Sequence, residues 1–197
     1  EMFQKLFSSE DFRPDMLKIY TALVIRNTGL YDLWKSGRYS ALENDEAAKL
    51  VANIKGVIPE YVRIMRVQRD IPAQLIEAGV KHSNLRQLAL QRLQEQNLHC
   101  RCIRCREVGH RWLKNQIKPD MNEVEIQTTK YPASEGTEIF ISAEDPKKDI
   151  VIGYLRLRIP SKKAHRPEIT AEPSSIVREL HVYGPVVPVG EHQASAW

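Results

Sequence analysis

The ten residues Ile150–Ile159 have the sequence IVIGYLRLRI, and their second half alternates between apolar and basic side chains. Side chains along a strand point alternately to opposite faces, so Leu155 and Leu157 share one face while Arg156 and Arg158 share the other. Three more segments have the composition of strands, with the first turn expected at Tyr131-Pro132: 124–130, 137–143 and 175–183. Together these segments predict an antiparallel sheet in the second half of the chain.

The first half of the chain predicts a different architecture. Apolar residues crowd positions 16–25 and predict a buried strand, and alternation over 61–67 predicts another. Apolar side chains recur at helical spacing over 43–58, where Asn44 is the expected N-cap, and again over 84–96. The order strand, helix, strand, helix is typical of an α/β unit with parallel strands. Because only about two repeats are visible, we expect the tail of a larger α/β domain.

Composition excludes several classes of protein. The 197 residues carry a net charge of +4, and their apolar stretches are too short to cross a bilayer. The N-terminus lacks the pattern of a secretory signal and does not begin with Met, so we expect a segment of a longer protein. No membrane partner and a cytoplasmic location are therefore expected.

All three cysteines of the chain fall within six residues, as Cys100, Cys102 and Cys105. Thiolates suit zinc, and a structural zinc site takes four ligands. His110 is the expected fourth ligand, and His99 could replace it. Two alternatives remain open at this point: an iron–sulfur cluster and three ordinary reduced cysteines. The crowding favours a zinc site in a reducing compartment.

Basic residues gather in two short runs, which is a pattern typical of phosphate binding. The first run is Arg63, Arg66 and Arg69, and the second is Arg101, Arg104, Arg106, Arg111 and Lys114. The alternative is that these arginines are solvated or pair with carboxylates.

Six blocks of sequence, in order along the chain, resemble the catalytic subunit of Elongator. They are FRPDMLKIY at 12–20, TGLYDLWKSGRY at 28–39, RVQRDIP at 66–72, SNLRQ at 83–87, RCREVG at 104–109 and VRELHVYGPVVPVG at 177–190. The resemblance runs from about residue 11 to the end of the chain. The cysteines suggest a bacterial or archaeal member of the family.

The resemblance implies an α/β plus α+β fold in three parts. Residues 1–97 would be the C-terminal part of a partial TIM-type radical SAM barrel, and 98–119 a zinc-binding linker. Residues 120–197 would be the first antiparallel strands of a GNAT-like acetyltransferase domain. The CxxxCxxC motif for the iron–sulfur cluster and the glycine-rich acetyl-CoA loop are absent from the sequence, so we expect this piece alone to be inactive.

The resemblance also implies the activity, which is carboxymethylation of the wobble uridine of tRNA at C5. Its implied cofactors are S-adenosylmethionine, an iron–sulfur cluster with ligands outside this chain, and zinc in the linker, with acetyl-CoA as co-substrate. The implied partners are tRNA and acetyl-CoA. A homodimer and, in organisms that have them, the other Elongator subunits are further partners that the resemblance allows.

Candidate residues of the barrel can be chosen by their positions on a predicted strand or directly after one. Lys18 and Tyr20 alternate with Ile19 on a strand, so both are expected to face a cofactor or the target base. Arg69 lies after a strand, where TIM-type barrels place their chemistry. Cofactor binding is therefore expected of Lys18, Tyr20 and Arg69. Pairing of Lys18 with a neighbouring acid, and structural ion pairs for Arg69 and Arg86, are the alternatives.

Candidate residues of the acetyltransferase-like part lie on the last strand. Glu179 and His181 share a face and Tyr183 follows, so these three are the expected catalytic residues. In acetyltransferase folds this strand lines the thioester, and its backbone at Leu180 and Val182 is expected to pair with the pantetheine arm. Either Glu179 or His181 could polarise water for thioester hydrolysis. The alternative is that His181 is an ordinary strand residue.

RNA contacts are expected from two segments. Positions 29–40 are expected to form a surface loop in which aromatics alternate with Lys35 and Arg38, a pattern suited to base stacking and backbone contacts. Packing of the loop base is the alternative role for these aromatics. Arginines expected to bind RNA elsewhere are Arg86, Arg101, Arg104 and Arg106.

Two rival functions remain. One is a lysine acetyltransferase that acts on protein, which would need only the second part of the chain. The other is a non-catalytic, zinc-dependent RNA-binding module. The barrel tail and the arginine-flanked cysteines argue against the first, because neither would help to acetylate a lysine.

Overall fold

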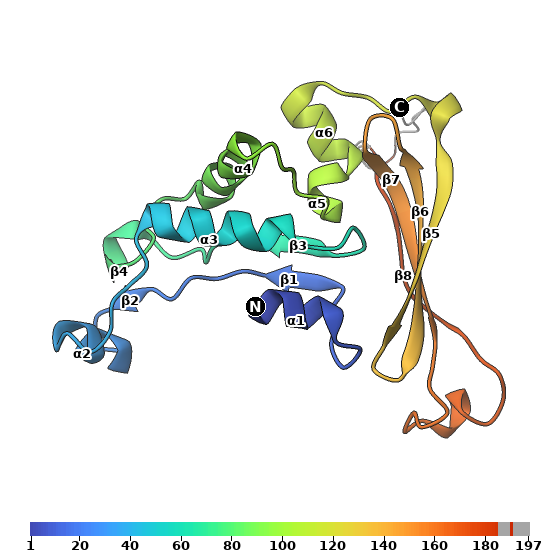
Figure 1. Ribbon diagram of the computed structural model, residues 1–197, viewed down its shortest axis with the longest axis horizontal. Helices are drawn as coiled ribbons and strands as arrows, with labels where there is room; N and C mark the ends of the chain where they lie inside the picture. Colours follow the sequence, from blue (N-terminus) through green and yellow to red (C-terminus); the bar gives the residue numbers. More distant parts are fainter. Residues whose placement is uncertain (185–189, 191–197) are drawn as a thin grey trace. The chain divides into compact units, whose positions relative to one another are not determined.

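The computed structural model describes residues 1–184 and Gly190, and it divides the chain into two compact units (Figure 1). One unit is Asp15–Cys102, and the other joins Glu1–Pro14 to the chain from Ile103 onward. This division differs from the predicted boundaries at 97 and 119. The first fourteen residues belong with the second half of the chain, and the predicted linker 98–119 is no separate unit.

The unit Asp15–Cys102 contains two pairs of short strands. Strand β1 (Met16–Lys18) pairs in parallel with β3 (Arg63–Arg66), whereas β2 (Val24–Ile25) pairs antiparallel with β4 (Ile76–Ala78). The parallel pair confirms the α/β pattern. The single strand predicted over 16–25 is wrong, because the chain leaves one partner strand and joins another between positions 19 and 23. The apolar density there reflects burial, with Ile19 and Val24 both inside the core.

Helices flank these strands. Helix α2 (Gly29–Lys35) corrects the predicted loop, and Thr28 caps it by accepting a hydrogen bond from the backbone N–H of Tyr31 at 3.2 Å. Helices α3 (Asn44–Gly56) and α4 (Leu85–Glu95) confirm the two predicted helices. The N-cap of α3 is Glu43 rather than Asn44, because Glu43 and Glu46 form a capping box. A 3₁₀ turn (Ala73–Leu75) precedes β4.

The core of this unit lies between α3 and α4, which run side by side in Figure 1. Their facing residues are small or branched and are almost fully buried: Ala47, Ala48, Val51, Ile54, Leu85, Ala89 and Leu93. The spacing of three and four places these side chains on one stripe of each helix. This burial forms the apolar interface between the two helices.

The second unit is built on a four-stranded antiparallel sheet. Its strands β5 (Glu125–Ala133), β6 (Gly136–Asp145), β7 (Ile150–Ile159) and β8 (Ile176–Val182) follow one another in space in sequence order, which confirms the predicted sheet. The first turn is at Ser134 and Glu135, both with positive φ, rather than at Tyr131-Pro132. Pro132 is accommodated because β5 pairs only with β6 in the described sheet.

Short helices complete this unit: α1 (Met2–Ser8), α5 (Ile103–Arg106), α6 (Val108–Asn115) and the 3₁₀ turns Met121–Glu123 and Pro167–Ile169. Two bonds tie the N-terminal segment to the β5–β6 hairpin. The guanidinium of Arg13 donates to the carbonyl of Pro132 at 2.9 Å, and the N–H of Ser134 donates to the carbonyl of Glu10 at 2.6 Å. Within the described residues, no helix has the length and apolar character that a bilayer-spanning segment needs.

The two faces of the sheet have an unusual polarity. Glu138, Arg156 and Ser142 are buried, whereas Leu180 and Val182 on the opposite face are strongly exposed. The alternation predicted for β7 is therefore present, but its basic face is the more buried one. Ion pairs across neighbouring strands make this burial tolerable, because a buried charge needs a partner that also fills its hydrogen bonds.

Candidate functional site

The predicted catalytic residues of β8 meet two residues of β7. Register places His181 opposite Tyr154 and Glu179 opposite Arg156. The Tyr154 hydroxyl donates to Oε1 of Glu179 at 2.7 Å, and Nε of Arg156 donates to Oε2 at 2.9 Å. Tyr154 and Arg156 are almost fully buried, with 3% and 1% exposed. Both oxygens of the Glu179 carboxylate are thus engaged by the neighbouring strand.

Aromatic rings extend this cluster along the strand. The His181 ring lies nearly parallel to that of Tyr154, with centroids 5.8 Å apart and an interplanar angle of 9°. The ring of Tyr183 lies 4.4 Å from His181 and 6.2 Å from Tyr154, centroid to centroid. We call Glu179, His181, Tyr183, Tyr154 and Arg156 the β7–β8 cluster. The structure therefore brings together the three predicted catalytic residues.

Sequence reasoning missed Tyr154 and Arg156 as members of this cluster. The signal that could have found them is register, since a strand pair places each residue beside one specific partner. Leu180 and Val182, predicted to pair with the pantetheine arm through their backbone, lie on the opposite face of β8 and expose their side chains to solvent. Their side chains are therefore separate from the β7–β8 cluster.

The predicted cofactor residues of the first unit lie near the ends of the parallel strands. Lys18 ends β1 and is exposed, and Tyr20 is exposed two residues later while Ile19 between them is buried. The guanidinium of Arg69 lies over the Tyr20 ring at 5.2 Å from its centroid. Cation–π attraction of this kind stabilises an exposed arginine at a fixed place. Tyr20 and Arg69 are thus brought together, with Lys18 two residues from Tyr20 along the chain.

The predicted RNA loop is the helix α2 and the turn that follows it. The rings of Tyr31 and Trp34 lie 5.8 Å apart, and Nζ of Lys35 lies 5.9 Å from the centroid of the Tyr31 ring. Arg38 is exposed and donates from Nε to the Ser36 hydroxyl at 3.1 Å. The segment presents one cationic and aromatic surface, which we call the α2 surface.

The three cysteines converge on one point. The sulfurs of Cys100, Cys102 and Cys105 all lie within 4.8 Å of one another, and the first two are buried. Sulfurs around a single tetrahedral zinc lie roughly 3.8 Å apart, given Zn–S bonds of about 2.3 Å. Three thiolates at this spacing need only a small contraction to hold the ion. The donor set therefore fits a soft metal.

His110, the predicted fourth ligand, is not grouped with the three sulfurs in this structure. Its Nε2 lies 3.0 Å from Oε1 of Glu107, the residue that precedes α6. His99, the alternative, is not grouped with the three sulfurs either within the described part of the chain. The helix directs the imidazole to the carboxylate three residues before it.

The predicted RNA-binding arginines have divergent environments. Arg106 has a side chain that is 1% exposed, and it pairs with Glu144 at 2.6 Å and with Asp149 at 3.5 Å. Arg86 donates to the backbone carbonyls of Ile64 and Met65 at 3.1 and 3.3 Å. Both arginines have structural partners, and burial removes Arg106 from any contact with RNA. This corrects the prediction for Arg106.

The other two arginines of the cysteine segment are more accessible. Arg101 is exposed and forms an ion pair with Glu60 at 3.1 Å. Arg104 is half-buried. The alternative that arginines of this run pair with carboxylates is thus confirmed for Arg101 and Arg106.

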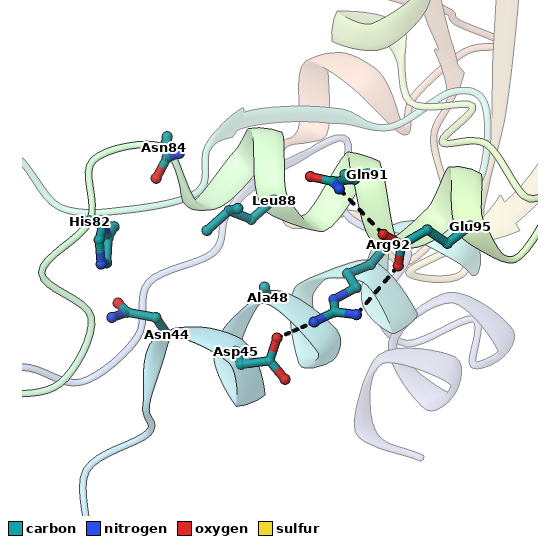
Figure 2. Close-up of a pocket in the computed structure, with 9 residues that line it drawn as sticks. All are labelled: Asn44, Asp45, Ala48, His82, Asn84, Leu88, Gln91, Arg92 and Glu95. Carbon is teal, nitrogen blue, oxygen red and sulfur yellow. Dashed lines mark hydrogen bonds and ion pairs between the residues drawn. The ribbon is translucent and has the colours of Figure 1, made fainter.

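A pocket of about 470 Å³ lies between α3 and α4 (Figure 2). Arg92 bridges the two helices by pairing with Asp45 on α3 and with Glu95 on its own helix. His82 and Asn84 stand at the other end of the pocket. None of the residues predicted as functional lines it, so this pocket is separate from the candidate sites above.

Known proteins and one protein-family domain match this chain. Residues 14–95 match the Radical_SAM C-terminal domain. Elongator complex protein 3 of Saccharomyces cerevisiae is 52% identical over 190 residues, which are 96% of this chain and 34% of that protein. The chain is a relative of Elongator complex protein 3. It spans about a third of the length of the curated relatives it matches.

Archaeal relatives of Elongator complex protein 3 match over the same region. The tRNA uridine(34) acetyltransferase of Methanocaldococcus infernus is 47% identical over 93% of this chain and 34% of its own length. A solved structure of the Methanocaldococcus infernus Elp3 with an N-terminal deletion matches with a TM-score of 0.87 and 46% identity, over 93% of this chain and 42% of that one. The resemblance found in the sequence is confirmed, and so is a partial radical SAM fold.

Proposed function

We propose that this chain is part of an enzyme that builds a carboxymethyl group onto C5 of the wobble uridine of tRNA. The observation that carries the proposal is similarity over nearly the whole chain to proteins named tRNA uridine(34) acetyltransferases. The match of residues 14–95 to the Radical_SAM C-terminal domain supports radical chemistry as the route to the new carbon–carbon bond. The enzyme would thus be a radical SAM protein of acyltransferase type. Its proposed location is the cytoplasm, where tRNA is available.

The first unit would position the radical cofactor. S-adenosylmethionine and an iron–sulfur cluster, when bound, supply the radical. The three cysteines present are spaced CxCxxC rather than CxxxCxxC, so the cluster ligands are not residues of this chain. Tyr20 and Arg69, already in contact, would bind the carboxylate or the adenosyl part of S-adenosylmethionine, with exposed Lys18 adding positive charge.

The second unit would hold acetyl-CoA. We propose that β5–β8 are the first strands of a GNAT-like acetyltransferase fold and that the backbone of β8 at Leu180 and Val182 pairs with the pantetheine arm. In the described sheet β8 pairs only with β7, so its other edge offers backbone N–H and C=O groups to a ligand. The β7–β8 cluster would then lie beside the thioester.

The tRNA would be bound mainly by the α2 surface. Its aromatic rings can stack on unpaired bases while Lys35 and Arg38 contact phosphates. Arg101 and Arg104 would extend the positive charge near the cysteines. We propose zinc at Cys100, Cys102 and Cys105 as a structural ion. A homodimer and other Elongator subunits are the proposed protein partners.

The experiment that tests the function supplies the full-length protein with tRNA, S-adenosylmethionine and acetyl-CoA labelled in the acetyl group, under anaerobic conditions. We expect the label in a 5-carboxymethyluridine nucleoside after digestion and mass spectrometry, and no product when S-adenosylmethionine is omitted. Label on protein lysines instead would favour a lysine acetyltransferase. Binding of tRNA without any transfer of label would favour a non-catalytic RNA-binding module.

A further inference from the structure

Glu179 has both of its carboxylate oxygens engaged by side chains of the neighbouring strand. Its Oε1 accepts a hydrogen bond from the buried hydroxyl of Tyr154, and its Oε2 accepts one from Arg156. The Arg156 side chain is 2% exposed, so this guanidinium depends on the carboxylate to balance its charge. Both carboxylate oxygens are occupied by these two donors, so the Glu179 carboxylate is suited to fixing its neighbours.

His181 has the opposite environment. Its ring is exposed on β8, packed on the near-parallel ring of Tyr154 and beside Tyr183. Within the part of the chain that the structure describes, neither imidazole nitrogen makes a hydrogen bond. The two tyrosine rings fix the plane of the imidazole, and its nitrogens are left open to a water molecule. An oriented imidazole with open nitrogens is the arrangement that a general base needs.

The link between the two residues is Tyr154. Its hydroxyl is anchored to Glu179, which is anchored in turn to Arg156. Because the His181 ring stacks on the same tyrosine, the chain Arg156–Glu179–Tyr154 determines where the imidazole lies. Phe140, whose ring centroid is 5.4 Å from that of Tyr154, supports the tyrosine ring from β6.

We propose that His181 is the general base of thioester hydrolysis and that Tyr154, Glu179 and Arg156 are positioning residues that hold its ring. This assignment rests on the function proposed above. An imidazole nitrogen takes a proton from water as the water oxygen bonds to the thioester carbonyl carbon. The carbon–sulfur bond then breaks, and the imidazolium returns a proton to the departing thiolate of coenzyme A. The products are free coenzyme A and a carboxylate, which releases the remaining proton to solvent, with no change in oxidation state.

The test measures tRNA-dependent release of coenzyme A from acetyl-CoA by the full-length protein. His181→Ala should lower the turnover rate about 10²- to 10⁴-fold, the usual contribution of a general base. Added imidazole should restore a measurable part of that rate, because the small molecule can enter the space left by the side chain. Tyr154→Phe keeps the ring and loses the hydroxyl, so its rate should fall by up to about tenfold. His165→Ala, at an exposed histidine of the same unit, is the matched control and should leave the rate unchanged.

The rescue by imidazole decides the assignment. If imidazole fails to restore the His181→Ala variant, or if that variant keeps its rate while Glu179→Gln loses it, the assignment is overturned. Added imidazole should not rescue Glu179→Gln, because this variant still has the imidazole of His181. Failure of the proposed function would appear differently, as a wild-type protein that releases no coenzyme A with tRNA present. Formation of 5′-deoxyadenosine, measured in parallel, checks that each variant retains the radical step.

Discussion

Two arginines close together in the sequence lie in opposite electrostatic environments. Arg106 is buried between Glu144 and Asp149, and Ser142 donates to the second oxygen of Glu144 at 2.6 Å. Arg101 pairs with Glu60 in the open, where about half of each partner's side chain or slightly less is exposed. Water and salt screen the second pair and hardly affect the first. The two residues allow the same substitution to be compared at a buried and at an exposed ion pair.

We expect Arg106→Ala to lower the free energy of unfolding by about 3–5 kcal/mol, because it leaves the Glu144 carboxylate buried without its partner. Arg101→Ala should change it by less than about 1 kcal/mol. Urea denaturation of both variants at the same salt concentration measures the difference. Equal losses would mean that the Arg106 pair contributes no more than a surface pair.

At this scale the sequence predicted which side chains of β8 share a face but not what holds them. Alternation placed Glu179 and His181 on one face, and the structure agrees. The partners Tyr154 and Arg156 depend on the pairing of two strands separated by a long loop. No local pattern reports that pairing, and the bulge between Arg156 and Leu157 shifts the register again.

At the scale of single elements, strand β6 ends in a buried and hydrogen-bonded carboxylate, that of Asp145. Asp145 is fully buried, and burial alone would raise its pKa. The backbone N–H groups of Asp120 and Lys148 donate to it at 2.9 and 3.1 Å, and together with the nearby Lys148 charge they lower the pKa below its ordinary value. A lowered pKa in the folded state stabilises the fold above the pKa of the unfolded chain, about 3.9.

We therefore expect Asp145→Asn to lower the free energy of unfolding at pH 7 by about 1–3 kcal/mol, because a neutral amide accepts weaker hydrogen bonds. The gap between variant and wild type should shrink as the pH falls below about 4, where the wild-type carboxyl takes up a proton. Denaturant titrations at several pH values measure the gap. Glu125→Gln, at an exposed position of β5, is the control and should show no such trend. A gap that persists at low pH would point to altered packing instead of lost charge.

The proposed role of helix α2 leads to a prediction about tRNA binding. Lys35→Ala should weaken tRNA binding by the full-length protein and reduce the slope of log Kd against log salt by about one, as expected for one lost phosphate contact. Lys49→Ala removes another exposed lysine, from α3, and should leave the slope unchanged. Binding isotherms over a salt series give both slopes. If the two variants behave alike, the α2 surface is not the tRNA contact.

Elements with a pattern that repeats over many residues were predicted well, and short elements were predicted poorly. The helical spacing of α3 and α4 runs over more than ten residues, and both helices were found, as was β7, whose second half alternates. The loop predicted at 29–40 is wrong because Tyr, Gly and Trp obscured a seven-residue helix whose clearest signal was its cap at Thr28. Strand β4, three residues long, had too few positions to show any period.

At the scale of the whole molecule, the cysteine cluster predicts a bound metal. We expect about one zinc ion per chain after purification, and Cys102→Ser should lose it, because a buried thiolate would be removed from the donor set. His110→Ala should retain the ion, since its imidazole contacts Glu107 instead. Elemental analysis of the three proteins measures the metal, and a chelator should lower the Tm of the wild type. Loss of zinc from the His110 variant would restore that residue as a ligand.

Division of the chain into units was only partly predictable from its sequence. The change from an α/β pattern to strands was visible near the cysteines. The place of residues 1–14 was not, since it depends on bonds from Glu10 and Arg13 to a hairpin far along the chain. Contacts at such separation leave no trace in composition or periodicity.

Those same bonds affect the order in which parts of the chain can fold during synthesis. Arg13 and its acceptor Pro132 are 119 residues apart. Ribosomes add about 5–20 residues per second, so the N-terminal segment emerges roughly 6–24 s before its partner exists. During that interval the unit Asp15–Cys102 can form, since all its strand pairs lie within its own sequence. The segment around Glu10 and Arg13 can form its bonds to the β5–β6 hairpin only after that hairpin has been synthesised.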